Sequence, residues 1–165
     1  MAENNASRDA TQYVTLGIDR EVFAVDVDRV REILDAQPVT RVPYAPPFML
    51  GMIDVRGRSV PVIDLRTKHG LTAAENTEQT RIIVLDIENQ GRSLTMGMLA
   101  DRVFEVTSLD DHDMEPPPDV GTHWRSDYIR GVGRRKDGFV IIFDLSRLFS
   151  TDETAFIGAD TEPGQ

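Results

Sequence analysis

The sequence predicts a mostly β protein built from two related lobes, each a small barrel of short strands. Short apolar runs alternate with turn signals along the chain, and this spacing favours small barrels. The same motifs occur in the same order in both halves, which indicates an internal duplication. Length and composition agree, because 165 residues with a hydrophobic fraction of 40% can bury the core of one domain.

Two pairs of motifs carry the duplication. DRVREI and DRVFEV share four of six residues and begin at residues 28 and 101, 73 positions apart. A segment from Gly51 to Asp64 returns 80 positions later, from Gly131 to Asp144. A period this long is not that of a solenoid. It predicts two lobes within one domain spanning 12–150.

The first lobe is expected at about 12–70 and contains three recognisable strands. These are residues 13–18, 21–27 and 60–63, with a turn at Asp19-Arg20 and a short helix from Leu65 to His69 closed by Gly70. Residues 28–34 are ambiguous, because their apolar positions fit either a helix or a strand face. Pro61 cannot donate a ladder hydrogen bond, so its strand should be an edge, or Pro61 should face away from a partner.

The second lobe is expected at about 80–150, with exchange of strands between the lobes left open. Strands are predicted over 81–87, 93–99 and 139–143, with a hairpin turn at 89–92 and a helix starting at Asp144. Residues 110–123 form a loop with three consecutive prolines. The segment 1–11 is expected to be disordered, and 151–165 partly helical or disordered.

Composition excludes several classes of function. The formal net charge of −10 argues against general nucleic-acid binding, and no apolar run is long enough to span a membrane. The absence of cysteine excludes disulfides and thiolate sites. The N-terminus lacks the apolar core of a secretory signal, so a cytoplasmic protein is expected.

No catalytic, metal or cofactor motif is present. His69, His112 and His123 have no metal-ligand spacing, and the acidic loop DDHDME lacks the pattern of an EF-hand. GVG at 131–133 lacks the third glycine of a dinucleotide fingerprint, so its glycines are expected at a turn or a bulge. We therefore expect neither an enzyme nor a cofactor, but a β-rich binding module; a small-molecule sensor is a weaker alternative, because it needs convergent buried polar groups.

Three stretches carry a resemblance to a known family. They are FAVDVDRVREIL, PYAPPFMLGMIDVRGRSVPVIDLR, and YIRGVG followed by VIIFDLSRLF. Together they resemble the CheW-type coupling proteins of bacterial chemotaxis, from about Gln12 to Phe149. The resemblance implies two five-stranded, SH3-like barrels packed around a shared core, in agreement with the repeat.

The resemblance also implies a function. Such proteins are non-catalytic scaffolds that couple the cytoplasmic tips of chemoreceptors to the regulatory domain of a CheA-type histidine kinase. They are cytoplasmic and are recruited to receptor arrays without inserting into the membrane. An adaptor in a non-flagellar array, with twitching or second-messenger output, is the alternative left open.

Site residues follow from the same resemblance. Arg56, in the family's N-x-R-G turn, is expected to contact the receptor or the array, with Glu32 beside it as an ion-pair partner. The other expected positions fall into three groups: Val30, Ile33 and Val55 on the receptor side of the first lobe, Val103 and Val106 in the groove between lobes, and Gly51, Gly57, Gly97 and Gly131 at backbone turns.

The chain departs from the family pattern near these positions. Asp54 stands where the family commonly has Asn, and adds a negative charge beside Arg56. Arg58 adds a positive charge after the turn. The basic run Arg134-Arg135-Lys136 is expected to be a solvated turn, with kinase contact as the alternative.

Overall fold

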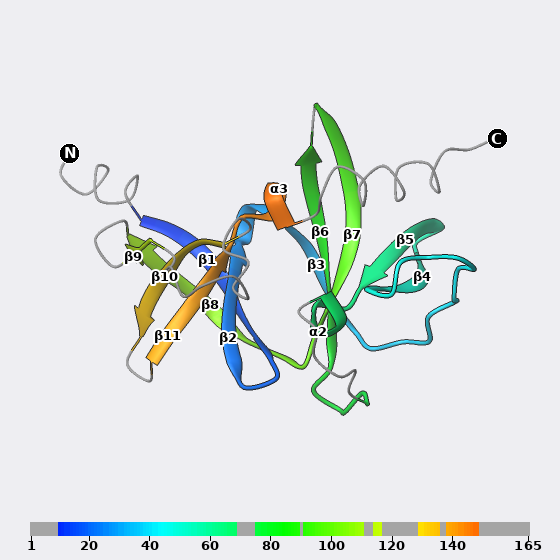
Figure 1. Ribbon diagram of the computed structural model, residues 1–165, viewed down its shortest axis with the longest axis horizontal. Helices are drawn as coiled ribbons and strands as arrows, with labels where there is room; N and C mark the ends of the chain where they lie inside the picture. Colours follow the sequence, from blue (N-terminus) through cyan, green and yellow to red (C-terminus); the bar gives the residue numbers. More distant parts are fainter. Residues whose placement is uncertain are drawn as a thin grey trace.

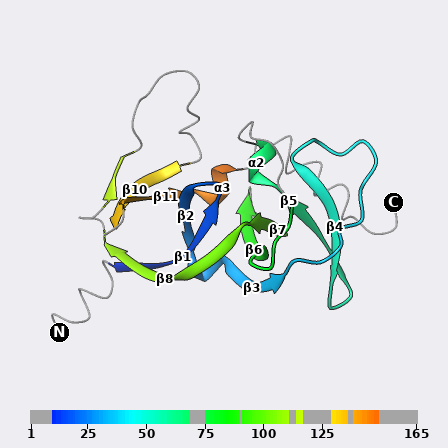
Figure 2. The same cartoon turned by 90° about the horizontal axis from the view of Figure 1, so that it is seen from below.

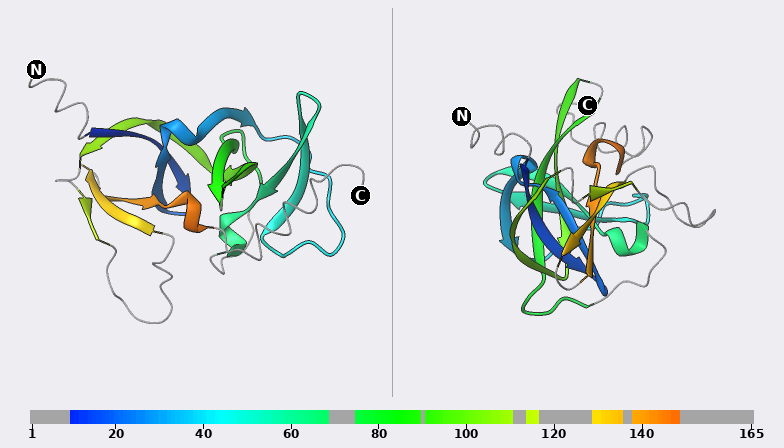
Figure 3. Two further views of the ribbon diagram at one scale, coloured as in Figure 1. Left: turned by 90° about the horizontal axis from the view of Figure 1, so that it is seen from above. Right: turned by 90° about the vertical axis from the view of Figure 1, so that its left-hand side faces the viewer.

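The computed structural model shows two curled β-sheets side by side (Figure 1). Each sheet, together with one short helix, forms one lobe. Figures 2 and 3 show the same division into two sets of strands from other directions. The residues that the structure describes are 10–68, 75–89, 91–110, 114–116, 129–135 and 138–148.

One sheet draws its strands from both ends of the described chain, and we call its lobe the terminal lobe. Its strand order is β8-β1-β2-β11-β10-β9, so the short β9 extends a set of five longer strands. Helix α3 follows β11. The elements are β1 (Ala10–Ile18), β2 (Glu21–Asp26), β8 (Arg102–Asp110), β9 (Met114–Glu115), β10 (Ile129–Arg135), β11 (Gly138–Phe143) and α3 (Leu145–Leu148).

The other sheet is continuous in sequence, and we call its lobe the central lobe. Its order is β3-β6-β7-β5-β4, and helix α2 follows β5. The elements are β3 (Val30–Asp35), β4 (Met49–Val55), β5 (Arg58–Ile63), α2 (Leu65–Lys68), β6 (Arg81–Asn89) and β7 (Arg92–Ala100).

The hairpins are exchanged between the halves of the sequence. The β1–β2 hairpin pairs with β8 and β11 from the C-terminal half, whereas the β6–β7 hairpin pairs with β3 and β5 from the N-terminal half. The lobes therefore do not coincide with residues 12–70 and 80–150. The chain passes between lobes twice, at the 3-10 helix η1 (Val27–Arg29) and at Asp101. Both passages fall on the repeated DRV motif.

The strand registers repeat as well, which confirms the duplication. Val106 of β8 lies opposite Val14, and its repeat counterpart Ile33 of β3 lies opposite Ile83. Both pairings then shift register at the corresponding position. The β4–β5 and β10–β11 pairings also share a shift, just before Gly51 and Gly131. Each shift marks a bulge, where one strand carries an extra residue.

The strands predicted from sequence exist, with small changes at their ends. β1 begins at Ala10 rather than Tyr13, and β2 ends at Asp26. The ambiguous segment 28–34 is the end of η1 followed by β3. In β3, half-buried and exposed residues alternate strictly, as expected for a strand with one face toward a core.

The expectation of an edge position for the strand with Pro61 is wrong, because β5 lies between β7 and β4. Pro61 is opposite Met52 of β4. The N–H and C=O of Met52 both bond to Thr40, so this is a non-hydrogen-bonded pair and the Pro61 nitrogen faces away from β4. The pairing of β5 with β7 begins only at Val62. The missing N–H of Pro61 therefore does not interrupt that ladder.

The core has three parts. The largest is shared between the lobes and joins side chains such as Leu16 and Phe143 of the terminal lobe to Ile83 and Met96 of the central lobe. Phe23 and Phe143 stack in it, with ring centroids 4.8 Å apart. Each lobe has a smaller core of its own, one around Tyr13 and the other around Ile82.

Several expectations concern residues outside the described ranges. These are the N-terminal segment through residue 9, the segment 151–165, all three histidines, Gly70, Lys136 and most of the proline-rich loop. Among the described residues, no group of side chains could hold a metal ion. No described helix is long and apolar enough to cross a membrane.

Candidate functional site

The arginine turn joins β4 to β5 at one end of the central lobe. Arg56 and Gly57 have φ values of 52° and 85°, so both central residues of this two-residue hairpin are left-handed, as in a type I′ turn. The Gly57 N–H donates to Asp54 Oδ1 over 2.8 Å, which pins the loop. An asparagine could accept the same bond, so Asp54 preserves the turn while adding a charge.

The ion pair expected between Glu32 and Arg56 is present. Arg56 Nη1 donates to Glu32 Oε2 over 2.6 Å, and this contact links β3 to the turn. The side chain of Arg56 is 78% exposed, whereas that of Glu32 is 17% exposed. The carboxylate is thus part of the lobe, and the guanidinium keeps most of its donors free for a partner.

A shallow pocket lies beside this ion pair. Arg31 and Arg58 bring two further cations to its wall, and Val55 and Val60 supply apolar surface. Arg31 binds Asp86 across the sheet, with Nε 3.1 Å from Oδ2. The remaining lining residues are Glu32, Arg56, Val84 and Thr95. This end of the central lobe therefore combines cations with a small apolar surface, in a chain that is acidic overall.

The predicted apolar residues separate into two kinds. Val30 and its repeat counterpart Val103 are half-buried against the shared core. Val55 is half-buried against the small core of the central lobe. Ile33 and its counterpart Val106 are 41% and 55% exposed. Only the last two offer a large apolar side chain to a partner without any rearrangement.

A second pocket lies at the junction between the lobes. Gln79 and Arg81 of the central lobe face Arg102, Val103 and Phe104 of β8 across it. We call it the junction groove. It contains Val103, which was expected there. Val106 lies further along β8, opposite Val14, and is not among the described lining residues.

The terminal lobe has a similar Glu–Arg contact, in which the arginine stands one position before Lys136, the repeat counterpart of Arg56. Glu105, the counterpart of Glu32, accepts a hydrogen bond from Arg135 Nη2 over 3.0 Å. Arg134 binds Glu115 over 2.8 Å, and its guanidinium lies over the ring of Phe139. The sequence predicted only a solvated turn, or a contact with the kinase, for the basic run Arg134-Arg135-Lys136. The shared glutamate of the two DRV motifs was the signal that sequence reasoning overlooked.

Three of the four glycines expected at turns lie elsewhere, and only Gly57 is in a turn. Gly51 and Gly131 lie within β4 and β10 beside the register shifts. Gly97 lies inside β7, in the central rather than the second lobe. A Cβ on Gly97 would lie 2.8 Å from Ile82 Cγ2, so close packing requires this glycine.

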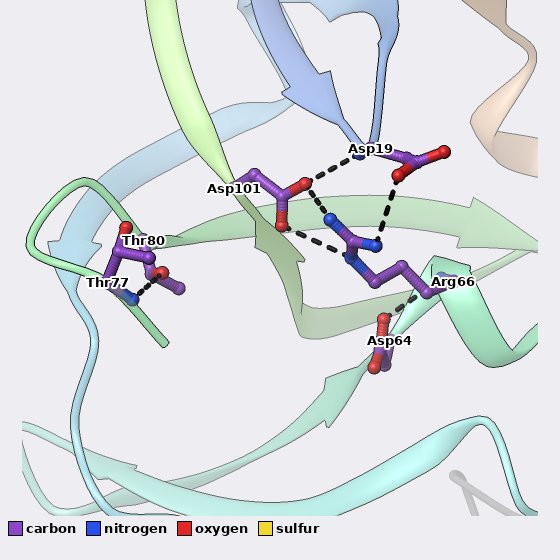
Figure 4. A network of polar contacts seen from close by, with 6 residues as sticks. All are labelled: Asp19, Asp64, Arg66, Thr77, Thr80 and Asp101. Atoms are coloured by element: carbon purple, nitrogen blue, oxygen red, sulfur yellow. Dashed lines mark hydrogen bonds and ion pairs between the residues drawn. The ribbon is translucent and has the colours of Figure 1, made fainter. Parts of the chain in front are cut away.

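A polar network that sequence reasoning missed joins the two lobes (Figure 4). Arg66, at the start of α2, binds Asp101 with Nε 3.3 Å from Oδ1 and with Nη2 on Oδ2. Its Nη1 lies 3.7 Å from Asp19 Oδ1 in the β1–β2 turn. Asp64 accepts the Arg66 N–H over 2.9 Å. Burial raises the pKa of the Asp64 carboxyl, and that hydrogen bond and the Arg66 charge only partly oppose the effect.

Comparison with known proteins gives a consistent result. Residues 12–153 match the CheW-like domain family. Chemotaxis protein CheW of Rhizobium meliloti is 28% identical, covering 92% of this chain and 96% of its own. Chemotaxis protein CheW of Treponema pallidum is 30% identical, covering 86% of this chain and 84% of its own. The crystal structure of the scaffolding protein TtCheW from Thermoanaerobacter tengcongensis has a TM-score of 0.76 at 30% identity, covering 87% of this chain and 90% of that one.

Proposed function

The chain belongs to the CheW-like domain family, and we propose that it is a non-catalytic adaptor in chemotaxis signalling. In this proposal it connects chemoreceptor tips to the regulatory domain of a CheA-type histidine kinase. It works in the cytoplasm, where it is recruited to receptor arrays. The names of its relatives and of its structural neighbour, a scaffolding protein, support the adaptor role.

The geometry of the arginine turn is the observation that carries the docking role. Arg56 is held in place by Glu32, yet 78% of its side chain remains exposed. A positioned guanidinium loses little freedom on binding and can make two parallel bonds to a carboxylate. We assign Arg56 to the receptor side, together with Glu32, Asp54 and Val55 around the turn and Ile33 on the adjacent β3.

The remaining apolar positions are assigned by their place in the fold. Val103 lines the junction groove, and Val30 occupies the corresponding position at the other passage between lobes. Val106 offers an exposed apolar side chain on β8. In the proposal, a receptor signal is a change in relative affinity or geometry at these surfaces, without chemistry in this chain.

A three-component pull-down tests the function. The protein is mixed with a soluble receptor signalling fragment and the regulatory domain of the cognate kinase, as wild type and as Arg56→Glu. Wild type should bridge the two partners. The variant should keep the kinase domain and bind the receptor fragment about tenfold more weakly, because interface arginines are frequent hot spots.

Arg92→Glu is the matched control, since it makes the same charge change at another exposed hairpin end of the same sheet. It should bridge like the wild type. Wild-type protein that binds neither partner would refute the adaptor role. Equal receptor affinity in wild type and Arg56→Glu would refute the assignment of Arg56 alone.

A further inference from the structure

The two places where the chain passes between the lobes carry the same DRV motif. They differ in the hydrogen bonds that hold them in position. Asp101 fills the passage from β7 to β8 and is half-buried. Its N–H donates to Gly17 O over 2.8 Å, and its Oδ2 accepts the Asp19 N–H over 2.6 Å. Asp28, the counterpart at the other passage, is exposed. One passage is therefore fastened to the end of the β1–β2 hairpin.

Arg66 extends this fastening to the other lobe. It starts from α2 of the central lobe and ends on Asp101 and Asp19, with its side chain only 12% exposed. Ion pairs that exclude water are screened less by salt than exposed pairs. A planar guanidinium with two donors on one carboxylate also fixes direction, which a single contact does not.

The duplication provides no second copy of this contact. Asp144 repeats Asp64, and its Oδ1 accepts the Ser146 N–H just as Asp64 accepts that of Arg66. Ser146 stands 80 positions after Arg66, and its short side chain is exposed. Only one of the two pseudo-equivalent helices thus carries a side chain that ties the lobes together at this position.

The fastened passage leads directly into the junction groove. Arg102, Val103 and Phe104 follow Asp101 in sequence and form one wall of the groove, while Gln79 and Arg81 form the other wall. These walls belong to different lobes, so the angle between lobes determines how far apart they stand. A contact that fixes Asp101 relative to α2 therefore restrains this angle, in addition to the core that the lobes share.

We propose that Arg66 is a positioning residue that locks the Asp101 passage and thereby sets the geometry of the junction groove. Its loss would leave both lobes folded on the shared core but widen the range of their relative orientations. A partner that docks across the groove would then have to select one orientation, and its affinity would fall accordingly. The affinity part of this inference rests on the proposed adaptor function.

The first arm measures the lobes without any partner. The chain has no cysteine, so Ser59→Cys on β5 and Ser108→Cys on β8 place one spin label on each lobe at exposed positions. The distance distribution between the labels should be narrow in the wild-type background and broader with Arg66→Gln. Arg66→Lys should restore only part of the narrow distribution, because it keeps the charge but not the two donors that fix direction.

Arg147→Gln is the matched control. It removes the same charge from α3, where Arg147 is 73% exposed and lies near Asp144, the residue just before the helix. Its distance distribution should equal that of the wild type. Identical distributions in wild type and Arg66→Gln would overturn the proposal. Should Arg66→Gln fail to fold by circular dichroism, Asp101→Asn decides the matter, since it keeps an acceptor for Asp19 but loses the charge that binds Arg66.

The second arm measures affinity for the receptor signalling fragment. Arg66→Gln should bind about fivefold to tenfold more weakly, within the usual range of coupling between sites. Arg66→Lys should recover only part of the affinity, in line with its partial recovery of the distance distribution. Equal affinities would overturn the link between lobe angle and groove. If the wild type binds no fragment, the receptor side of the adaptor proposal fails, and the distance measurement still decides the role of Arg66.

Discussion

At the scale of single residues, this protein uses arginine in two different ways. Arg56 projects into solvent from a turn and is steadied by one carboxylate. Arg66 is largely covered and contacts carboxylates of the other lobe. The first was expected, because the resemblance to the CheW-type family places Arg56 in a turn with Glu32 beside it. The sequence could not predict the second, because Asp19 and Asp101 are brought to Arg66 only by the exchange of hairpins.

The Glu32–Arg56 pair should contribute little to stability. Arg56→Gln, Glu32→Gln and the double variant form a mutant cycle, measured by urea unfolding. Because one partner is largely exposed, the coupling free energy should be about 0.2–1 kcal/mol. Such a small coupling would show that the ion pair serves docking rather than the stability of the fold. A coupling free energy above about 2 kcal/mol would show a structural role instead.

Asp64 should make stability depend on pH in a defined direction. Its side chain is buried, and its pKa is raised in the folded state by that burial. Its favourable contribution is therefore full below the unfolded pKa and is lost as the pH rises through the folded pKa. Asp64→Asn imitates the protonated acid and keeps an acceptor for the Arg66 N–H.

The free energy of unfolding of Asp64→Asn, relative to wild type, should increase as the pH is raised from about 4 to about 7, because the favourable contribution of the wild-type carboxyl declines above the ordinary pKa of an aspartate in the unfolded chain. Urea unfolding at three pH values across this range checks the trend. Asp144→Asn makes the same chemical change at the less buried repeat counterpart and serves as the control. A constant difference across the range would contradict the assignment.

At the scale of elements, the strands were predictable where a short apolar run stands between turn residues. The segment with Phe23 and Val25 is such a run, and the strand is there, although Ala24 on its other face is buried as well. β8 was not predicted, because its exposed apolar residues Phe104 and Val106 break the alternation between core and solvent. The bulge beside Gly51 was not predicted, and Gly131 was left between a turn and a bulge, because a glycine at a bulge and a glycine at a turn look alike in sequence.

The two bulge glycines should differ in their tolerance of alanine. A Cβ on Gly51 would lie 2.1 Å from the backbone oxygen of Thr40, at a φ of 150°. A Cβ on Gly131 would lie 3.0 Å from the backbone oxygen of Glu115. Gly51→Ala should therefore cost about 3 kcal/mol of unfolding free energy and Gly131→Ala clearly less, as measured by thermal or urea unfolding.

Gly57→Ala calibrates this comparison. A Cβ there meets nothing within 4 Å, so only the left-handed backbone resists it. Its cost should be about 1–2 kcal/mol. If Gly51→Ala proves no worse than Gly57→Ala, the close approach of Thr40 is not the reason for glycine at position 51.

At the scale of the whole molecule, the sequence predicted two related lobes but could not assign the hairpins to them. The halves are similar enough that local chemistry alone would allow two pairings of the β1–β2 hairpin. It could pair with β3 and β5, or with β8 and β11. The choice is set by packing across the shared core, which no single segment reveals. The terminal lobe consequently needs both ends of the described chain, and its C-terminal strands cannot close a sheet without β1 and β2.

This architecture predicts that the two lobes unfold together. Phe143 stacks on Phe23 inside the core that both lobes share, so Phe143→Ala should cost about 3–5 kcal/mol. Because residues of the central lobe lose the same packing, calorimetry should show one transition at a lower temperature, with equal calorimetric and van't Hoff enthalpies. Phe139→Ala, on the same strand but 58% exposed, should change stability by less than about 0.5 kcal/mol. Two resolved transitions in Phe143→Ala, with the central lobe melting at its original temperature, would mean that the lobes are independent units that merely touch.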